Sequence, residues 1–201
     1  MDLENNARHK TKMQKLKKNI DYSIGKANIS RGVSILLTGN GKGKTSSAFG
    51  MAMRALGYNQ NVAIIQFIKG KQLSGEEIFI RKNFPKITFH QMNTGFTWDT
   101  QDKAKDKAAA KKTWEYAKKI LKQEKYNLVI LDELTYMLSF KYLDEAEVLD
   151  SLQNKPKNQS VIVTGRGGGK SLRDWADTIS EVRDIKHAFN SGIMARKGVD
   201  Y

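Results

Sequence analysis

The sequence contains no cysteine. This absence excludes disulfides, thiolate nucleophiles, zinc–thiolate sites and iron–sulfur clusters, so any chemistry must use oxygen and nitrogen groups and bound cofactors. The three histidines, His9, His90 and His187, are scattered without the spacing of metal ligands, and no Ser/His/Asp arrangement is visible. We therefore assign the histidines no role from the sequence.

Long apolar runs are also absent. No run approaches the roughly 18 residues that span a bilayer, and the polar start MDLENNARHK lacks the apolar stretch of a secretion signal. We therefore expect a soluble, cytoplasmic protein. A chain of 201 residues is about the size of one globular domain with a terminal extension.

Acidic residues are in the minority, since 35 Lys and Arg residues face 21 Asp and Glu residues and the formal net charge is +14. Residues 1–32 hold eight basic and three acidic residues, and residues 102–125 hold nine lysines and four acidic residues. Most of the excess thus lies on two predicted helices. A solvated helix face, or attraction for any anionic ligand, explains it about as well as a nucleic acid does.

Residues 1–32 are predicted to form a basic, amphipathic N-terminal helical arm. Its apolar residues recur at helical spacing and form a thin stripe, made of Met13, Leu16, Ile20, Ile24 and Ala27. A stripe of this width cannot form a domain core. We expect the arm to dock on the body of the protein, formed by residues 33–201, or on a second subunit, in preference to an anionic surface.

From Val33 onward, short runs of Val, Ile and Leu alternate with helical stretches. The predicted strands read VSILLT, VAIIQFI, ITFHQM, NLVILDE and SVIVTG. Continuously apolar strands are typical of a parallel sheet that is covered on both faces. We therefore predict a three-layer α/β fold with a mostly parallel sheet of about six strands and helices on both faces.

The longest predicted helix of the body spans residues 102–125. It places Ala110, Trp114, Ala117 and Leu121 at successive turns, with lysines elsewhere. This spacing predicts that Trp114 belongs to the core and does not bind a ligand.

The stretch TGNGKGKTSSAFG, residues 38–50, joins an apolar strand to a helix of small residues. A glycine-rich turn that opens a helix directs backbone N–H groups and the positive helix end at one point, which suits a phosphate. Lys44 adds a charge and Thr45 a hydroxyl for a magnesium ion. The pattern G-x-x-x-x-G-K-[ST] requires glycine at position 38, where this chain has Thr38, so the loop is effectively one residue shorter.

A second motif, NLVILDE at residues 127–133, is an apolar strand that ends in Asp132 and Glu133. In P-loop proteins an acidic residue at this position, called Walker B, helps to hold magnesium. Alone, the run would be better explained as a strand followed by a helix-capping acid. Together with the glycine-rich loop, it predicts a magnesium site.

A third apolar strand, within SVIVTGRGGGK at residues 160–170, brings Thr164 and Arg166 toward the same edge of the sheet. Ligands of such sheets gather at the carboxyl ends of the strands. Arg166 either binds polyphosphate or another anion, or caps a helix end; the first role is favoured but both stay open.

Two aromatic residues, Phe96 and Trp98, lie in the segment TGFTWDT at residues 94–100. The segment follows a predicted strand and has no periodicity that would bury both rings. Such a pair suits a large planar, apolar ligand. A loop that inserts its aromatic residues into the core explains the composition equally well.

Seven blocks of the sequence together resemble the P-loop family of ATP:corrinoid adenosyltransferases. In chain order they are TGNGKGKT, IIQFIKG, TGFTW, VILDELTY, IVTGRG, ADTISEVRDIKHAF and GVDY. The resemblance extends over about residues 31–201, and TGFTW and DELTY are its specific parts. It implies the P-loop NTPase (RecA-like) version of the predicted fold, with ATP, Mg²⁺ and a corrinoid such as cobalamin as ligands.

The resemblance implies a transfer of the 5′-deoxyadenosyl group of ATP to the cobalt of a reduced corrinoid, cob(I)alamin. Inorganic triphosphate is released and adenosylcobalamin is formed. Because the cobalt itself attacks the ribose 5′ carbon, no protein nucleophile or general base is required. Catalysis then depends on positioning and on neutralising the leaving group.

The resemblance also implies roles for individual residues. The triphosphate would be held, in an orientation opposite to that in hydrolases, by a loop and helix start made of Asn40, Gly41, Lys42, Gly43, Lys44, Thr45 and Ser46. Thr45 and Glu133 would hold magnesium with support from Asp132. Phe96 and Trp98 would cover the lower face of the corrin, displacing its lower ligand so that the cobalt is easier to reduce. Lys44 would also serve catalysis, and Arg54 and Arg166 are weaker candidates for nucleotide contact.

The partners implied by the resemblance are a flavoprotein reductant and a second copy of the chain, with the N-terminal helix covering the active site of a homodimer. Neither a nucleic acid nor a membrane is expected as a partner.

Two other functions remain as alternatives. A RecA-like, nucleic-acid-dependent ATPase predicts ATP hydrolysis to the nucleoside diphosphate, stimulation by DNA or RNA and a steep salt dependence. A P-loop kinase for a small metabolite predicts ADP, in place of triphosphate, as product.

Overall fold

The computed structural model describes residues 2–68, 73–92 and 102–201, and it divides the chain into two units, Met1–Ser30 and Arg31–Tyr201. The first unit contains helix α1 (Asp2–Lys26). Apolar side chains of the predicted stripe, from Met13 to Ile24, are exposed on this helix, and Ala27 lies just beyond its end. In the part of the chain that the structure describes, no helix has the length and apolar character needed to cross a bilayer.

The second unit is built on a six-stranded sheet with the order β3-β2-β4-β5-β1-β6, formed by the described residues. The strands are β1 (Ser34–Thr38), β2 (Val62–Gln66), β3 (Thr88–Gln91), β4 (Leu128–Asp132), β5 (Ser160–Thr164) and β6 (Thr178–Glu181). All five neighbouring pairs are parallel. The predicted α/β fold is confirmed, and the sheet is parallel throughout.

Burial follows the position of each strand in the sheet. The central strands β2 and β4 are buried at every position, as their continuous apolar runs predicted. The two edge strands differ, because β3 is half-buried and β6 is exposed along its length. Strand β6 has the sequence TISE, which lacks a continuous apolar run, as expected for a strand at the edge of the sheet.

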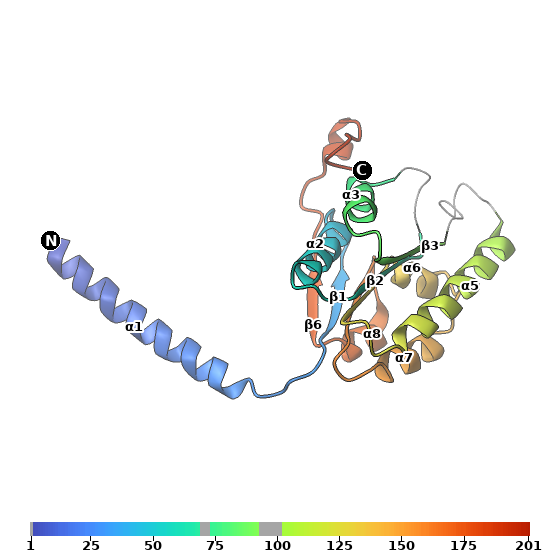
Figure 1. The fold of residues 1–201 in the computed structure, drawn as a ribbon. Coiled ribbons are helices and arrows are strands. Elements are labelled where there is room, and N and C mark those ends of the chain that lie inside the picture. Colours follow the sequence, from blue (N-terminus) through green and yellow to red (C-terminus); the bar gives the residue numbers. More distant parts are fainter. Residues whose placement is uncertain (1, 69–72, 93–101) are drawn as a thin grey trace. The chain divides into compact units, whose positions relative to one another are not determined.

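Helices cover both faces of the sheet (Figure 1). Helices α2 (Lys44–Gly57) and α3 (Gly75–Asn83) pack on one face, where Ala48, Phe49 and Ile80 contact alternate strand residues such as Ile64 and Ile130. The other face carries α5 (Lys103–Leu121), α6 (Leu134–Ser139), α7 (Glu145–Gln153) and α8 (Gly169–Trp175). A short 3-10 helix, η1 (Ala188–Ser191), follows β6.

The core stripe predicted for α5 is confirmed. Ala110, Trp114, Ala117 and Leu121 are all buried, and the Trp114 ring centroid lies 6.4 Å from that of Phe67. The predicted length of this helix is wrong at its C-terminal end.

Helix α5 starts after Asp102, whose carboxylate accepts from the backbone N–H of Lys105, but it stops at Leu121, four residues earlier than predicted. Consecutive turns follow, and they bring the buried Tyr126 to Thr88, where the two hydroxyl groups lie 2.7 Å apart. The chain must turn here to enter β4, so the lysine-rich continuation cannot remain helical.

One ion pair ties the amino ends of two sheet strands together. The Asp177 carboxylate accepts both guanidinium N–H groups of Arg31 and, at 2.8 Å, the backbone N–H of Ser34 at the start of β1. In return, the backbone N–H of Asp177 donates to the Ser34 carbonyl. The Arg31 hydrogen bonds and the Ser34 N–H lower the pKa of Asp177 from 3.8 to about 2.

We expect the Asp177→Asn substitution to destabilise the protein in a pH-dependent way. A carboxyl group with a lowered pKa stabilises the fold above its unfolded-state pKa and loses this effect as the pH falls toward the folded-state value. Because the pair is partly exposed and screened by solvent, the melting temperature at pH 7 should fall by only about 2 °C. Thermal unfolding between pH 7 and pH 2 should show this difference shrinking below about pH 4.

Asp174→Asn, on the exposed surface of α8, is the matched control and should follow the wild type at every pH. A difference between Asp177→Asn and the wild type that stays constant down to pH 2 would contradict the assigned role of this pair.

Candidate functional site

The glycine-rich loop between β1 and α2 has the geometry of an anion-binding turn. Gly43 is the N-cap of α2 with a φ of 119°, a left-handed conformation that favours glycine. Lys44 is the first residue of the helix, so the free N–H groups of the first turn follow directly. The loop therefore directs the positive end of α2 at the point where the predicted phosphate would bind.

Two other glycines of the loop lie against the backbone that follows β6. The Gly41 N–H donates to the Val182 carbonyl at 2.7 Å. A Cβ atom added at Gly39 would lie 2.3 Å from the Val182 carbonyl oxygen, and one at Gly41 would lie 2.6 Å from that of Arg183. The loop is thus pressed against this segment so closely that neither position has room for a side chain.

Thr38 explains the departure from the usual glycine pattern. It is the last residue of β1, it is buried, and its hydroxyl donates to the Gly167 carbonyl in the loop after β5. A glycine at this position would lack that hydrogen bond. The phosphate loop is therefore fixed on two sides, by the segment after β6 and by the loop after β5.

Lys44 is buried at the base of the loop. Its Nζ donates to the Gly41 carbonyl at 2.8 Å, and 7% of its surface is exposed. Burial lowers the pKa of Lys44, with a smaller effect of Arg166 in the same direction, while the carboxylates of Glu133 and Asp132 oppose the change. The ammonium group therefore lies in a poorly solvated place where a bound anion would interact with it strongly.

Asp132, at the end of β4, is the meeting point of the hydrogen bonds beneath the loop. Its Oδ1 accepts from the Thr45 hydroxyl at 2.9 Å and from the Thr164 hydroxyl at 2.7 Å. Its Oδ2 accepts from the Gln66 amide at 2.9 Å. The buried carboxylate is thus oriented by three donors, as a buried acidic group requires.

Glu133 follows Asp132 in a left-handed conformation, with a φ of 60°. Its backbone N–H donates to the Thr164 hydroxyl at 3.0 Å, and it is the N-cap residue of α6. A non-glycine residue held in this region is strained, and such residues are concentrated at functional sites. Gly165 gives the turn its space, because a Cβ there would lie 2.0 Å from the Thr135 hydroxyl oxygen.

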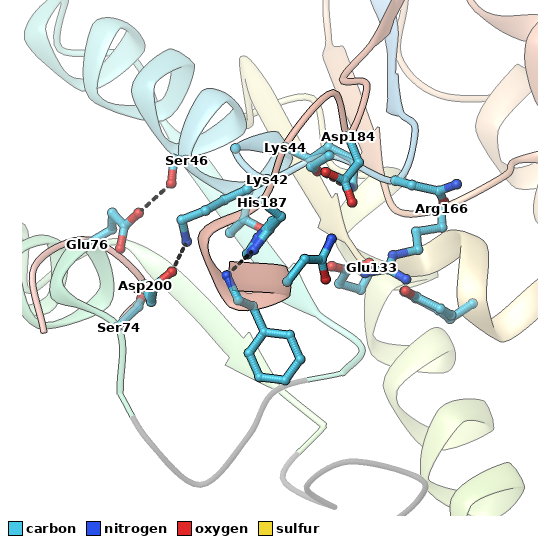
Figure 2. Close-up of a pocket in the computed structure, with 17 residues that line it drawn as sticks. Lys42, Lys44, Ser46, Ser74, Glu76, Glu133, Arg166, Asp184, His187 and Asp200 are labelled. Atoms are coloured by element: carbon cyan, nitrogen blue, oxygen red, sulfur yellow. Dashed lines mark hydrogen bonds and ion pairs between the residues drawn. The ribbon is translucent and has the colours of Figure 1, made fainter. Parts of the chain in front are cut away.

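These elements surround a cavity of about 570 Å³ at the carboxyl edge of the sheet (Figure 2). The structure brings most of the predicted site residues to its wall, namely Asn40, Gly41, Lys42, Gly43, Lys44, Thr45, Ser46, Glu133 and Arg166. Asp132 does not line the cavity itself, but its carboxylate accepts a hydrogen bond from Thr45, which does.

The structure does not bear out one predicted site residue, Arg54, and does not test two others, Phe96 and Trp98. Arg54 is exposed in the last turn of α2, ten residues after Lys44 and at the far end of the helix from the loop, and it is not among the lining residues. Phe96 and Trp98 lie outside the described residues. The roles assigned to these three residues stay predictions.

The structure adds lining residues to which the sequence analysis gave no role. Helix α3 and its N-cap contribute Ser74 and Glu76, helix α6 contributes Tyr136, and the C-terminal segment contributes Asp184, His187, Phe189, Asn190 and Asp200. Two of them are tied to the loop region, since Lys42 Nζ lies 3.0 Å from an Asp200 oxygen and the Ser46 hydroxyl donates to Glu76 at 2.9 Å (Figure 2).

The C-terminal contribution follows from the place of β6 in the sheet. Because β6 pairs in parallel with β1, its carboxyl end emerges beside the glycine-rich loop, and the chain beyond it reaches the cavity. In the sequence, this segment falls in the blocks ADTISEVRDIKHAF and GVDY, which carried part of the family resemblance. Local patterns alone did not reveal which edge of the site they would approach.

The oxygen groups at this site fit a magnesium ion that is shared with a polyphosphate. Mg²⁺ prefers oxygen ligands and in such sites takes one or two carboxylates together with substrate phosphates and water. The Thr45 hydroxyl and Glu133 line the cavity, and Asp132 accepts from Thr45. Among the described residues, no three His, Asp or Glu side chains cluster as a complete metal cage.

Comparison with known proteins identifies close relatives along the whole chain. A family model described as ATP:corrinoid adenosyltransferase BtuR/CobO/CobP matches residues 30–201. A corrinoid adenosyltransferase of Escherichia coli (strain K12) is 43% identical over 194 residues, which cover 96% of this chain and 98% of the relative.

Two further relatives are also corrinoid adenosyltransferases. The corrinoid adenosyltransferase CobA of Salmonella typhimurium is 44% identical over 194 residues, with 96% of this chain and 98% of the relative covered. A corrinoid adenosyltransferase of Pseudomonas aeruginosa is 44% identical over 198 residues, with 98% of each chain covered. The resemblance drawn from the sequence motifs is confirmed, and the chain belongs to the ATP:corrinoid adenosyltransferase family.

Proposed function

We propose that this protein transfers the 5′-deoxyadenosyl group of ATP to the cobalt of cob(I)alamin and releases inorganic triphosphate. The observation that carries the proposal is the loop of residues 39–43 with Lys44 and Thr45 behind it, next to Asp132, in a chain that matches the family model over residues 30–201. The family match favours this function over a nucleic-acid-dependent ATPase or a metabolite kinase.

In the proposed reaction, the electron pair of the reduced cobalt forms a bond to the ribose C5′ atom. The bond between C5′ and its oxygen breaks, and that electron pair leaves with the triphosphate. The cobalt of the substrate is thereby formally oxidised from Co(I) to Co(III), and no further oxidant is needed. The protein must hold C5′ open to attack and stabilise the negative charge of the leaving group.

The residues of the loop are suited to hold that leaving group. The N–H groups at the start of α2 and the buried Lys44 ammonium provide positive charge without the need to move during the reaction. Arg166 lines the same cavity and adds a planar donor group for phosphate oxygens. Thr45 and Glu133, supported by Asp132, would hold Mg²⁺, which supplies neutralisation of the triphosphate charge when it is bound.

Tyr136 contributes a hydroxyl at the wall of the cavity. Burial and the nearby Glu133 carboxylate raise the pKa of Tyr136, with Arg166 opposing the change. The phenol therefore keeps its proton at neutral pH. We propose that it donates a hydrogen bond to a substrate oxygen.

We further propose that the protein acts as a homodimer in which α1 covers the active site, and that a flavoprotein supplies the electrons that reduce the corrinoid. The basic sequence of α1 and its exposed apolar residues, among them Leu16 and Ile20, support a docking role for this helix.

The product of the reaction tests the proposal. Anaerobic incubation with ATP, Mg²⁺ and chemically reduced cobalamin should yield light-sensitive adenosylcobalamin, followed by its absorbance, and one triphosphate per turnover. Formation of ADP without a spectral change would contradict the proposal and favour one of the two alternative functions, the ATPase if orthophosphate is released and the kinase if the phosphate is transferred to a metabolite.

The Lys44→Met substitution should reduce kcat by about 100-fold or more, because it removes a preorganised charge at the leaving group. Lys119→Met, on the exposed side of α5, removes the same charge elsewhere and should leave kcat unchanged. The same absorbance assay measures both variants. An equal effect of the two substitutions would show that only the net charge of the protein matters.

The aromatic pair is tested by changing the way in which the corrinoid is reduced. If Phe96 and Trp98 displace the lower ligand of the corrinoid, then Phe96→Ala and Trp98→Ala should slow the reaction by about tenfold or more when a reductase must reduce cob(II)alamin. With chemically reduced cob(I)alamin, the same variants should work nearly as fast as the wild type. Equal losses in both assays would contradict this role.

A further inference from the structure

Four neighbouring strands of the sheet end in a polar side chain, and these side chains form a row. Gln91 ends β3, Gln66 ends β2, Asp132 ends β4 and Thr164 ends β5. Gln66 is in register with Gln91 on one side and with Asp132 on the other. Parallel pairing therefore places the four residues side by side along the carboxyl edge.

The row is joined by hydrogen bonds into one network. Thr164 and Gln66 both donate to Asp132, as described above. The Gln91 amide donates to Gln66 Oε1 at 2.9 Å and to Glu77 Oε2, on α3, at 2.7 Å. Gln66, Glu77 and Asp132 each expose at most 2% of their surface, so water cannot replace these bonds.

The direction of the hydrogen bonds is fixed by the two carboxylates, Asp132 and Glu77, on either side of the two glutamines. Asp132 can only accept from the Gln66 side chain, so Gln66 must turn its NH₂ group toward Asp132 and its oxygen toward Gln91. Gln91 must then turn its NH₂ group toward both Gln66 and Glu77. Neither amide can flip without leaving two like groups face to face.

The network ends at the hydroxyl of Thr45. This hydroxyl has one proton, which it donates to Asp132 Oδ1. Its lone pairs must therefore point away from Asp132. Thr45 lines the cavity, so its oxygen is oriented as an acceptor for a cation in that cavity.

The other end of the network is held by helix α3. Glu77 Oε1 accepts from the Arg81 guanidinium at 2.8 Å, one turn along the same helix. The neighbouring Glu76 accepts from Ser46 in the first turn of α2. Helix α3 is thus attached to the cavity twice, directly through Glu76 and through the two glutamines to Asp132.

We propose that Gln66 and Gln91 are positioning residues for the magnesium–triphosphate site. They hold the Asp132 carboxylate in the one orientation that takes the Thr45 proton and turns the Thr45 oxygen toward the cation. This inference rests on the proposed function, because it requires that Mg²⁺ is bound with ATP beside Thr45. It assigns neither glutamine a contact with substrate or metal.

The test is calorimetric binding of ATP, with and without Mg²⁺, in the absence of corrinoid. We expect Gln66→Met, which keeps the length of the side chain but removes its amide, to weaken ATP binding in the presence of Mg²⁺ by about tenfold. Binding of metal-free ATP should change by less than about twofold. Gln91→Met should show the same selective loss to a smaller degree, because Gln66 keeps its own bond to Asp132.

Gln159→Met is the matched control. Gln159 is also a buried glutamine with an amide hydrogen bond, to the Gln123 carbonyl, but it precedes β5 at the opposite edge of the sheet. Its substitution should lower thermal stability and leave both binding constants unchanged. If Gln66→Met does not fold, Gln91→Met, at a half-buried position, carries the same test.

Three results would overturn the positioning role: no effect of the glutamine substitutions, an equal effect with and without Mg²⁺, or no Mg²⁺ effect on the wild type. These are distinct from failure of the proposed function. A wild type that binds ATP more tightly with Mg²⁺, yet forms no adenosylcobalamin, contradicts the transfer reaction and leaves the binding result valid.

Discussion

The carboxylate of Asp132 is the group on which the arrangement of the site depends. It is buried at the end of a central strand, and burying an acidic group is costly unless donors surround it. The sheet supplies those donors from both neighbouring strands, Gln66 on β2 and Thr164 on β5, and helix α2 supplies Thr45. This requirement explains why polar residues follow the apolar runs at the same level in adjacent strands. Through Gln66 and Gln91, the hydrogen bonds of Asp132 also connect the loop and the sheet to α3.

The phosphate loop is held from outside by its neighbours as well. Thr38 bonds to the loop after β5, and Gly39 and Gly41 pack against the backbone after β6. Such a loop has little freedom to rearrange when a ligand binds, so its N–H groups are oriented in advance. Preorganised dipoles stabilise a developing charge without a cost of reorientation. This property is suited to a reaction in which, as we propose, the protein contributes no nucleophile and the triphosphate leaves as a highly charged anion.

Much of the fold and part of the site could be predicted from local patterns. Apolar runs identified five strands, β1 to β5, but not the exposed edge strand β6. Helical spacing placed Trp114 in the core, and the glycine-rich loop with Asp132 and Glu133 located the cavity. The rest depends on long-range pairing. The parallel contact of β6 with β1 brings His187 and Asp200 to the cavity, and the register of β2 with β3 builds the glutamine row. Arg54 was named because of the family resemblance, although the ten residues between Lys44 and Arg54 already correspond to about 15 Å of helix.

The most direct test of the proposed transfer is the fate of the oxygen between C5′ and the α-phosphorus of ATP. With ¹⁸O at this position and cob(I)alamin as acceptor, all of the label should appear in inorganic triphosphate, because the C5′–O bond breaks and the loop retains an intact leaving group. Label that remains attached to the nucleoside, in ADP or AMP, would show cleavage of a phosphorus–oxygen bond. That result would contradict adenosyl transfer and identify the cavity as the site of a phosphoryl-transfer reaction.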